Sequence, residues 1–174
     1  MKVIAFGAST SSKSLNKEFA TWVANQLPNA DVTVLDLNDY EMPIYSSDLE
    51  AANGVPEQAT QFVEAIQSAD FLVISIAEHN GAYTAAFKNI FDWASRKQVK
   101  FFNEIPMLLV STSPGGRGGL TALEIAAQRF PIHGAVIQGQ FSLPNFKTTF
   151  AAGQGIIDEA FAKQFQDGLA ELKF

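Results

Sequence analysis

The chain has 174 residues, a formal net charge of −6 at pH 7 and no cysteine. This length predicts one domain over residues 1–174. The absence of cysteine excludes disulfides, thiolate metal sites and thiol nucleophiles, and it is typical of a cytoplasmic protein. A negative charge without a cluster of Lys or Arg argues against nucleic acid or an anionic membrane as a partner. No apolar run approaches the roughly 20 residues of a membrane span.

Strands and helices are predicted to alternate along the first half of the chain. The apolar run Val3–Ala8 predicts a buried strand, and Val32–Leu35 predicts a second. The residues between them recur at helical spacing until Pro28: Leu15, Phe19, Trp22, Val23 and Leu27. The polar segment 36–54 predicts a loop, and Pro56 suits the first position of a helix that reaches Ile66.

The second half continues the same alternation. Strands are predicted at Phe71–Ile76, Ile105–Val110 and Gly134–Ile137. Helices are predicted at 87–94, 120–130 and 157–169, and residues 139–155 predict an irregular loop. Alternation of this kind favours an α/β fold with a doubly wound, five-stranded parallel sheet and helices on both faces. The ligand site of such a sheet lies at the carboxyl ends of its strands.

The loop after the first strand contains five hydroxyl side chains: Ser9, Thr10, Ser11, Ser12 and Ser14. A strand followed by the amino end of a helix presents free N–H groups, so this loop suits a phosphate. An ordinary turn with Ser12 or Ser14 as the helix N-cap is the alternative. The spacing of Gly7 and Lys13 approaches that of a Walker A loop, but Ser12 replaces its second glycine, which argues against an NTPase.

The loop after the third strand combines an acid, an imidazole and an amide with a glycine, in the order Glu78, His79, Asn80 and Gly81. The backbone of an Asn-Gly turn can approach a planar heterocycle closely, and His79 or Tyr83 is placed to lie against its face. An ordinary turn with an exposed His79 explains the same residues.

The loop after the fourth strand has four glycines in five positions, between Gly115 and Gly119. Packing alone does not call for so many glycines, so a ligand is expected to approach this backbone. A flexible loop with Arg117 in solvent is the alternative. Elsewhere His133 has no partners at metal-ligand spacing, and the sequence contains no G-x-S-x-G nucleophile elbow.

Together the three loops resemble those of the NADPH-dependent FMN reductase family, flavodoxin-like proteins that include quinone, azo-dye and chromate reductases. In the first loop Ser9, Ser14 and Asn16 match the family's phosphate ligands, while Ala8 replaces a glycine and Ser11 replaces a frequent arginine. In the second loop Glu78, Asn80 and Gly81 match, whereas Ala77 replaces proline and His79 replaces tyrosine. Residues 113–118 match the motif S-P-G-G-R-G in full, and residues 88–96 resemble a helix that packs at dimer interfaces.

The resemblance implies a bound FMN and a flavodoxin-like fold. The implied cofactor-binding residues are Ser9, Ser11, Ser14, Leu15, Asn16, Glu78, His79, Asn80, Gly81, Ser113, Gly115 and Gly116. NADPH or NADH would reduce the flavin, and a quinone or similar small molecule would then accept the electrons in a ping-pong cycle. Because FMN carries this chemistry, no catalytic side chain and no metal are implied.

Arg117 is the candidate for an anionic group of NADPH, since a guanidinium suits phosphate. A homodimer or homotetramer is implied by the resemblance as well. The competing function is that of a flavodoxin-type electron carrier that never binds a nicotinamide. A phosphate-binding hydrolase or NTPase is supported only by the near-Walker spacing.

Overall fold

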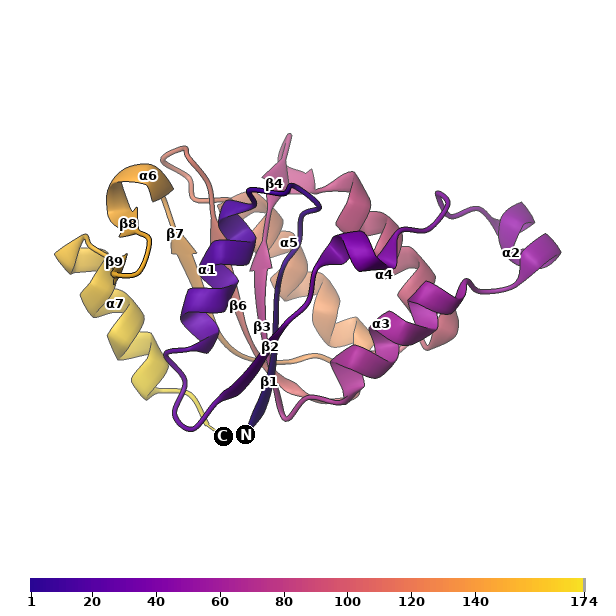
Figure 1. The fold of residues 1–174 in the computed structure, drawn as a ribbon, viewed down its shortest axis with the longest axis horizontal. Helices are drawn as coiled ribbons and strands as arrows, with labels where there is room; N and C mark the ends of the chain where they lie inside the picture. The colour runs from indigo at the N-terminus through magenta and orange to yellow at the C-terminus, as the bar shows by residue number, and fades with distance from the viewer. Residues whose placement is uncertain (174) are drawn as a thin grey trace.

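The computed structural model describes residues 1–173, and a five-stranded parallel sheet lies at its centre (Figure 1). The strands are β1 (Lys2–Gly7), β2 (Asp31–Val34), β3 (Phe71–Ile76), β6 (Pro106–Thr112) and β7 (Val136–Leu143), in the order β2-β1-β3-β6-β7. The chain runs from β1 to one edge and returns through β3 to the other, so the switch point lies between β1 and β3. The predicted doubly wound sheet is confirmed.

Helices cover both faces of the sheet (Figure 1). Helices α1 (Leu15–Ala24) and α7 (Glu159–Ala170) pack on one face, with a core that includes Phe19 and Phe165. Helices α3 (Glu57–Gln67), α4 (Ala85–Lys97) and α5 (Leu120–Arg129) pack on the other, with Phe62, Phe87 and Leu123 in the core. All six residues of β3 are buried, which explains its unbroken apolar run. No helix in residues 1–173 has the length and apolar character needed to cross a bilayer.

Segment 36–54, which the sequence predicts as a loop, contains two short helices. These are η1 (Leu37–Tyr40), a 3-10 helix, and α2 (Ser47–Asn53). Side-chain caps explain both, because Asp36 accepts a hydrogen bond from Asn38 N–H and Ser46 accepts one from Leu49 N–H. No residue of α2 is buried, and the helix projects from the body of the molecule (Figure 1). Hydrophobic periodicity therefore gives no signal for it.

The carboxyl-terminal third also differs from the prediction. Strand β7 continues to Leu143, through residues predicted as irregular loop, because its backbone pairs with β6 as far as Thr112. The rest of that segment forms α6 (Phe146–Thr149) and the hairpin β8 (Phe150–Ala151) with β9 (Gly155–Ile156). His133 lies in η2 (Phe130–His133), a 3-10 helix, and not in the following strand.

The glycines of the fold yield a prediction for stability. A Cβ at Gly7 would overlap the backbone of Asn16 and Lys17, so Gly7→Ala is expected to cost roughly 1–3 kcal/mol of unfolding free energy. Gly168 lies inside α7, where a Cβ would meet no atom within 4 Å, so Gly168→Ala is the matched control and should stabilise by about 0.5–1 kcal/mol. Urea unfolding of both variants measures the difference. Equal effects would show that α1 does not depend on Gly7 for its approach to β1.

Candidate functional site

The three predicted loops meet at the carboxyl edge of the sheet, around a cavity of about 250 Å³. Most predicted site residues line it, namely Ser9, Ser11, Ser14, Leu15, Asn16, Glu78, His79 and Ser113. Lys13, Ala77, Thr112 and Pro114 complete the lining. Asn80, Gly81, Gly115, Gly116 and Arg117 belong to the same loops but not to the cavity wall. The structure therefore assembles these segments, which are distant in sequence, at the place where a parallel sheet binds its ligand.

One end of the cavity is suited to an anion. Ser14 is the N-cap of α1, and its hydroxyl oxygen accepts a hydrogen bond of 3.1 Å from Lys17 N–H. The N–H groups of Leu15 and Asn16, in the first turn, have no partner in an α-helix. The hydroxyl of Ser9 accepts a hydrogen bond of 3.2 Å from Ser11 N–H. Hydroxyl hydrogens, free amides and the positive helix end together match a phosphate.

The side chain of Asn16 is engaged within the protein. Its Oδ1 accepts hydrogen bonds from the Ser75 hydroxyl at 2.7 Å and from Thr112 N–H at 3.1 Å. Its Nδ2 donates to Thr112 C=O at 3.1 Å, and the residue is only 7% exposed. The carboxamide therefore joins α1 to β3 and β6, and the group of Asn16 that is left for a phosphate ligand is its backbone N–H.

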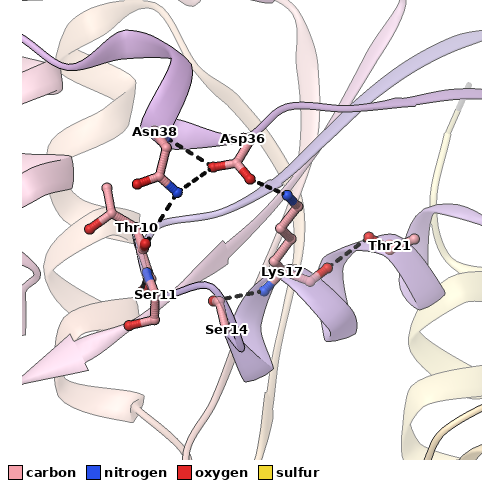
Figure 2. A network of polar contacts seen from close by, with 8 residues as sticks. Thr10, Ser11, Ser14, Lys17, Thr21, Asp36 and Asn38 are labelled. Carbon is pink, nitrogen blue, oxygen red and sulfur yellow. Dashed lines mark hydrogen bonds and ion pairs between the residues drawn. The ribbon is translucent and has the colours of Figure 1, made fainter.

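Lys17, Asp36 and Asn38, which the sequence analysis does not assign to the site, hold the first loop in place through a polar network (Figure 2). Asn38 donates from Nδ2 to Thr10 C=O at 3.1 Å and from its backbone N–H to Asp36 at 2.9 Å. Lys17 Nζ forms an ion pair of 2.5 Å with Asp36. The hydrogen bond from Lys17, followed by that from Asn38 N–H, lowers the pKa of Asp36 from 3.8 to about 2. The Lys17 charge is thus neutralised within the protein.

The second loop forms a tight hairpin of β4 (Glu78–His79) and β5 (Ala82–Tyr83). Asn80 and Gly81 have φ of 54° and 75°, as a turn with two left-handed residues requires. The carboxylate of Glu78 accepts a hydrogen bond of 3.1 Å from Ala122 N–H at the start of α5. It thereby supplies the side-chain cap that Gly119, the N-cap of α5, lacks. His79 is exposed at the edge of the cavity, so the structure combines the ordinary turn with a position beside the site.

The glycines of the third loop fall into two groups. Gly118 and Gly119 are buried with φ of 60° and 77°, and a Cβ on Gly118 would overlap Ser142 and the chain after it. Gly115 and Gly116 are exposed, and the nearest atom to a Cβ on either is 3.8 Å away. Packing therefore requires the first pair and leaves the second pair unexplained. A ligand that approaches the backbone would explain it.

Two further residues complete the description of the site. Arg117 is exposed and donates a hydrogen bond of 3.1 Å to the Thr121 hydroxyl. Within residues 1–173, no group of three or more His, Asp or Glu side chains is placed to hold a metal ion. The arrangement places an anion-binding helix end and exposed loop backbone at one edge of the sheet.

The Lys17–Asp36 ion pair predicts an acid-sensitive component of stability. Because folding lowers the pKa of Asp36, the pair stabilises the protein above about pH 4, and this contribution is lost as the pH falls toward about 2. Both side chains are more than a third exposed, so solvent screening limits the contribution to about 0.5–1 kcal/mol. Urea unfolding between pH 5 and pH 2 should show that Asp36→Asn lacks this component.

The matched control is Asp167→Asn, which removes a carboxylate from the more exposed ion pair with Lys163. This variant should show the same loss of unfolding free energy between pH 5 and pH 2 as the parent protein. An Asp36→Asn variant with the acid sensitivity of the parent would contradict the role given to the pair.

Comparison with known proteins places these observations in a family. The model of NADPH-dependent FMN reductases matches residues 1–148. An uncharacterized protein of Mycoplasma pneumoniae, the MG342 homolog, is 31% identical over 134 residues, which cover 74% of this chain and 78% of that protein. A quinone reductase of Escherichia coli K12 is 31% identical over 111 residues, 61% of this chain and 59% of that protein.

Solved structures show the same relationship. FerB of Paracoccus denitrificans, a flavoenzyme NAD(P)H:(acceptor) oxidoreductase, superposes with a TM-score of 0.74 at 25% identity, covering 97% of this chain and 93% of that chain. A flavodoxin of Pseudomonas aeruginosa shares the fold, with a TM-score of 0.57 at 15% identity over the full length of both chains. The chain therefore belongs to the NADPH-dependent FMN reductase family and is an oxidoreductase that uses FMN and NAD(P)H.

Proposed function

We propose that the protein transfers two electrons from NADPH or NADH, by way of FMN at the carboxyl edge of the sheet, to a quinone or a similar small acceptor. The nicotinamide loses a hydride and is oxidised, and the quinone gains the two electrons and the proton of that hydride, with a second proton from solvent, to become a hydroquinone. The observation that carries the proposal is the anion-binding start of α1 beside the exposed Gly115 and Gly116, whose lack of side chains packing does not explain.

The residues at this edge suit the two ends of FMN. The hydroxyls of Ser9 and Ser14 and the N–H groups of Leu15 and Asn16 would hold the phosphate. Ser11 lines the same end, where an arginine is frequent in the family, so this chain would bind phosphate with hydroxyls and amides. FMN supplies the relay between hydride donor and acceptor. The protein contributes binding, orientation and the exclusion of water.

The hairpin and the glycine loop would flank the flavin ring. The backbone at Asn80 and Gly81 lies in a tight turn, and that at Gly115 and Gly116 has no side chain in the way, so both can approach a flat ring. His79 extends from the same hairpin next to the cavity, and Ser113 lines its wall. None of these groups needs to exchange a proton for the ring to be held.

We propose that donor and acceptor occupy one position in turn, in a ping-pong cycle. The three loops flank one flavin position, and the sequence has no second glycine-rich dinucleotide fingerprint that would hold a nicotinamide elsewhere. Arg117 projects from the glycine loop with one hydrogen bond, to Thr121, so its remaining guanidinium donors are available to a phosphate of NADPH.

The relatives support the class of acceptor and leave its identity open. The Escherichia coli relative is named a quinone reductase, and one from Bacillus is named an NADPH azoreductase. We assign quinones as the first class to test because quinone reductases recur among the relatives. We also propose a cytoplasmic location and a homodimer or homotetramer with α4 at a subunit contact.

Removal of the Ser14 hydroxyl tests the phosphate site. Ser14→Ala should weaken FMN binding about 10- to 100-fold, because a hydrogen bond to a charged group contributes about 1.5–3 kcal/mol. Titration of the flavin-free protein with FMN, followed by flavin fluorescence, measures the affinity. Ser46→Ala is the matched control, since Ser46 also caps a helix but lies outside the cavity. Unchanged FMN affinity in Ser14→Ala would refute the assignment.

Steady-state kinetics tests the shared position. Double-reciprocal plots with NADPH and a benzoquinone should give parallel lines. Anaerobic NADPH should also bleach the flavin, which it would not do in an electron carrier that has no nicotinamide site.

Arg117→Ala should raise KM for NADPH about tenfold, because one charge-assisted contact is lost, and leave KM for the quinone nearly unchanged. Unaltered KM for NADPH in Arg117→Ala would show that Arg117 does not contact NADPH. In the parent protein, intersecting double-reciprocal lines would exclude the ping-pong cycle.

A further inference from the structure

Lys13 lies in the wall of the cavity at the sheet edge, together with Ser11 and Ser14. Ser12 and Lys13 form a turn directly before Ser14, which is the N-cap of α1. Lys13 therefore lies at the end of the cavity that suits an anion. It matches none of the family's phosphate ligands, and the proposed function does not use it.

The positive charge of Lys13 has no partner in the part of the chain that the structure describes. Its side chain is exposed, and no ion pair or side-chain hydrogen bond within residues 1–173 engages its ammonium group. Lys17, in the first turn of α1, is neutralised by Asp36. Arg117 lies outside the cavity wall. Among the residues that line the cavity, Lys13 thus supplies the unpaired cation.

The carboxylate in the cavity wall is engaged elsewhere. Among the lining residues the acid is Glu78, which accepts a hydrogen bond of 3.1 Å from Ala122 N–H. Glu78 belongs to the β4–β5 hairpin and not to the first loop. The ammonium group of Lys13 is therefore available to an anionic ligand.

The first loop lacks the cation that is frequent in the family. Ser11 stands where many members have an arginine, and it offers a hydroxyl without a charge. The donors that remain at this end are neutral hydroxyls and amides. A phosphate monoester carries a charge of about −1.5 to −2 at pH 7, and the chain itself carries −6, so a local cation would favour phosphate binding.

We propose that Lys13 binds the phosphate of FMN and supplies the charge that the family's arginine provides at position 11. This assignment rests on the FMN position of the proposed function. An ammonium group on a four-carbon side chain donates up to three hydrogen bonds, but it lacks the bidentate geometry of a guanidinium. Because Lys13 is exposed, salt screens its charge, and FMN affinity should therefore fall as ionic strength rises.

Titration of the flavin-free full chain with FMN and with riboflavin, which lacks the phosphate, tests the proposal. Lys13→Met keeps most of the side-chain length and removes the charge. It should weaken FMN binding about 5- to 20-fold, because one charge-assisted contact is lost, and leave riboflavin binding within about twofold. Lys2→Met is the matched control, since it removes an exposed cation at the opposite, amino end of β1. It should leave both affinities unchanged.

Ionic strength and a rescue variant provide independent measurements. A rise from about 50 mM to about 500 mM sodium chloride should weaken FMN binding to the parent more than FMN binding to Lys13→Met. Lys13→Met combined with Ser11→Arg restores a cation at the family's position. This double variant should recover FMN affinity to within about threefold of the parent.

Several results would overturn the role of Lys13 and leave the proposed function intact. They are equal FMN affinity in the parent and Lys13→Met, equal losses of FMN and riboflavin binding in that variant, and FMN binding to the parent that does not weaken with salt. The last measurement needs no variant, so it decides even if Lys13→Met misfolds. A parent that binds FMN no more tightly than riboflavin would instead overturn the phosphate site, and with it both proposals.

Discussion

The buried carboxamide of Asn16 is the interaction on which the site edge of this protein depends. It receives a hydrogen bond from Ser75 at the end of β3 and exchanges two with the backbone of Thr112 at the end of β6. The Thr112 hydroxyl donates in turn to Leu143 C=O at 2.7 Å, at the end of β7. A connected series of hydrogen bonds therefore joins three strand ends to the start of α1. Loss of one partner would leave buried polar groups unsatisfied, at a cost of about 1–3 kcal/mol each.

The same edge is braced from the opposite face of the sheet. Thr84 is the N-cap of α4 and donates from its hydroxyl to Ala8 C=O at 2.8 Å, so the start of α4 is tied to the first loop. Asn38 holds the same loop further along, through Thr10 C=O. These hydrogen bonds explain how the serine-rich first loop, which has Ala and not Gly at position 8, holds one backbone conformation. The rigidity of the site comes from its neighbours and not from the loop's own sequence.

Local pattern was enough to predict the sheet and the loops that meet at its carboxyl edge, but it could not predict which residues pair over long distances in the chain. The apolar runs of β1, β3 and β6 are buried on both faces, so their signal is strong. The partner of Asn16 lies 96 residues away, and no spacing rule reports such a contact. Asp36 and Asn38 directly follow strand β2 at the same edge of the sheet. Their position after a strand could have indicated that they lie near the site. The division of the glycines into Gly118 and Gly119 against Gly115 and Gly116 depends on what surrounds each backbone, which only the fold defines.

The cap that Glu78 provides for α5 links the dynamics of two elements. Helices begin to fray at their ends, and the amide of Ala122 in the first turn of α5 is protected by a carboxylate from the β4–β5 hairpin, because Gly119 offers no side chain. Opening of the hairpin would therefore expose the amide of Ala122 to solvent exchange without unfolding the rest of the helix. A ligand that orders the hairpin would slow this exchange, so one backbone amide on α5 reports the state of a loop that precedes it by some forty residues in the chain.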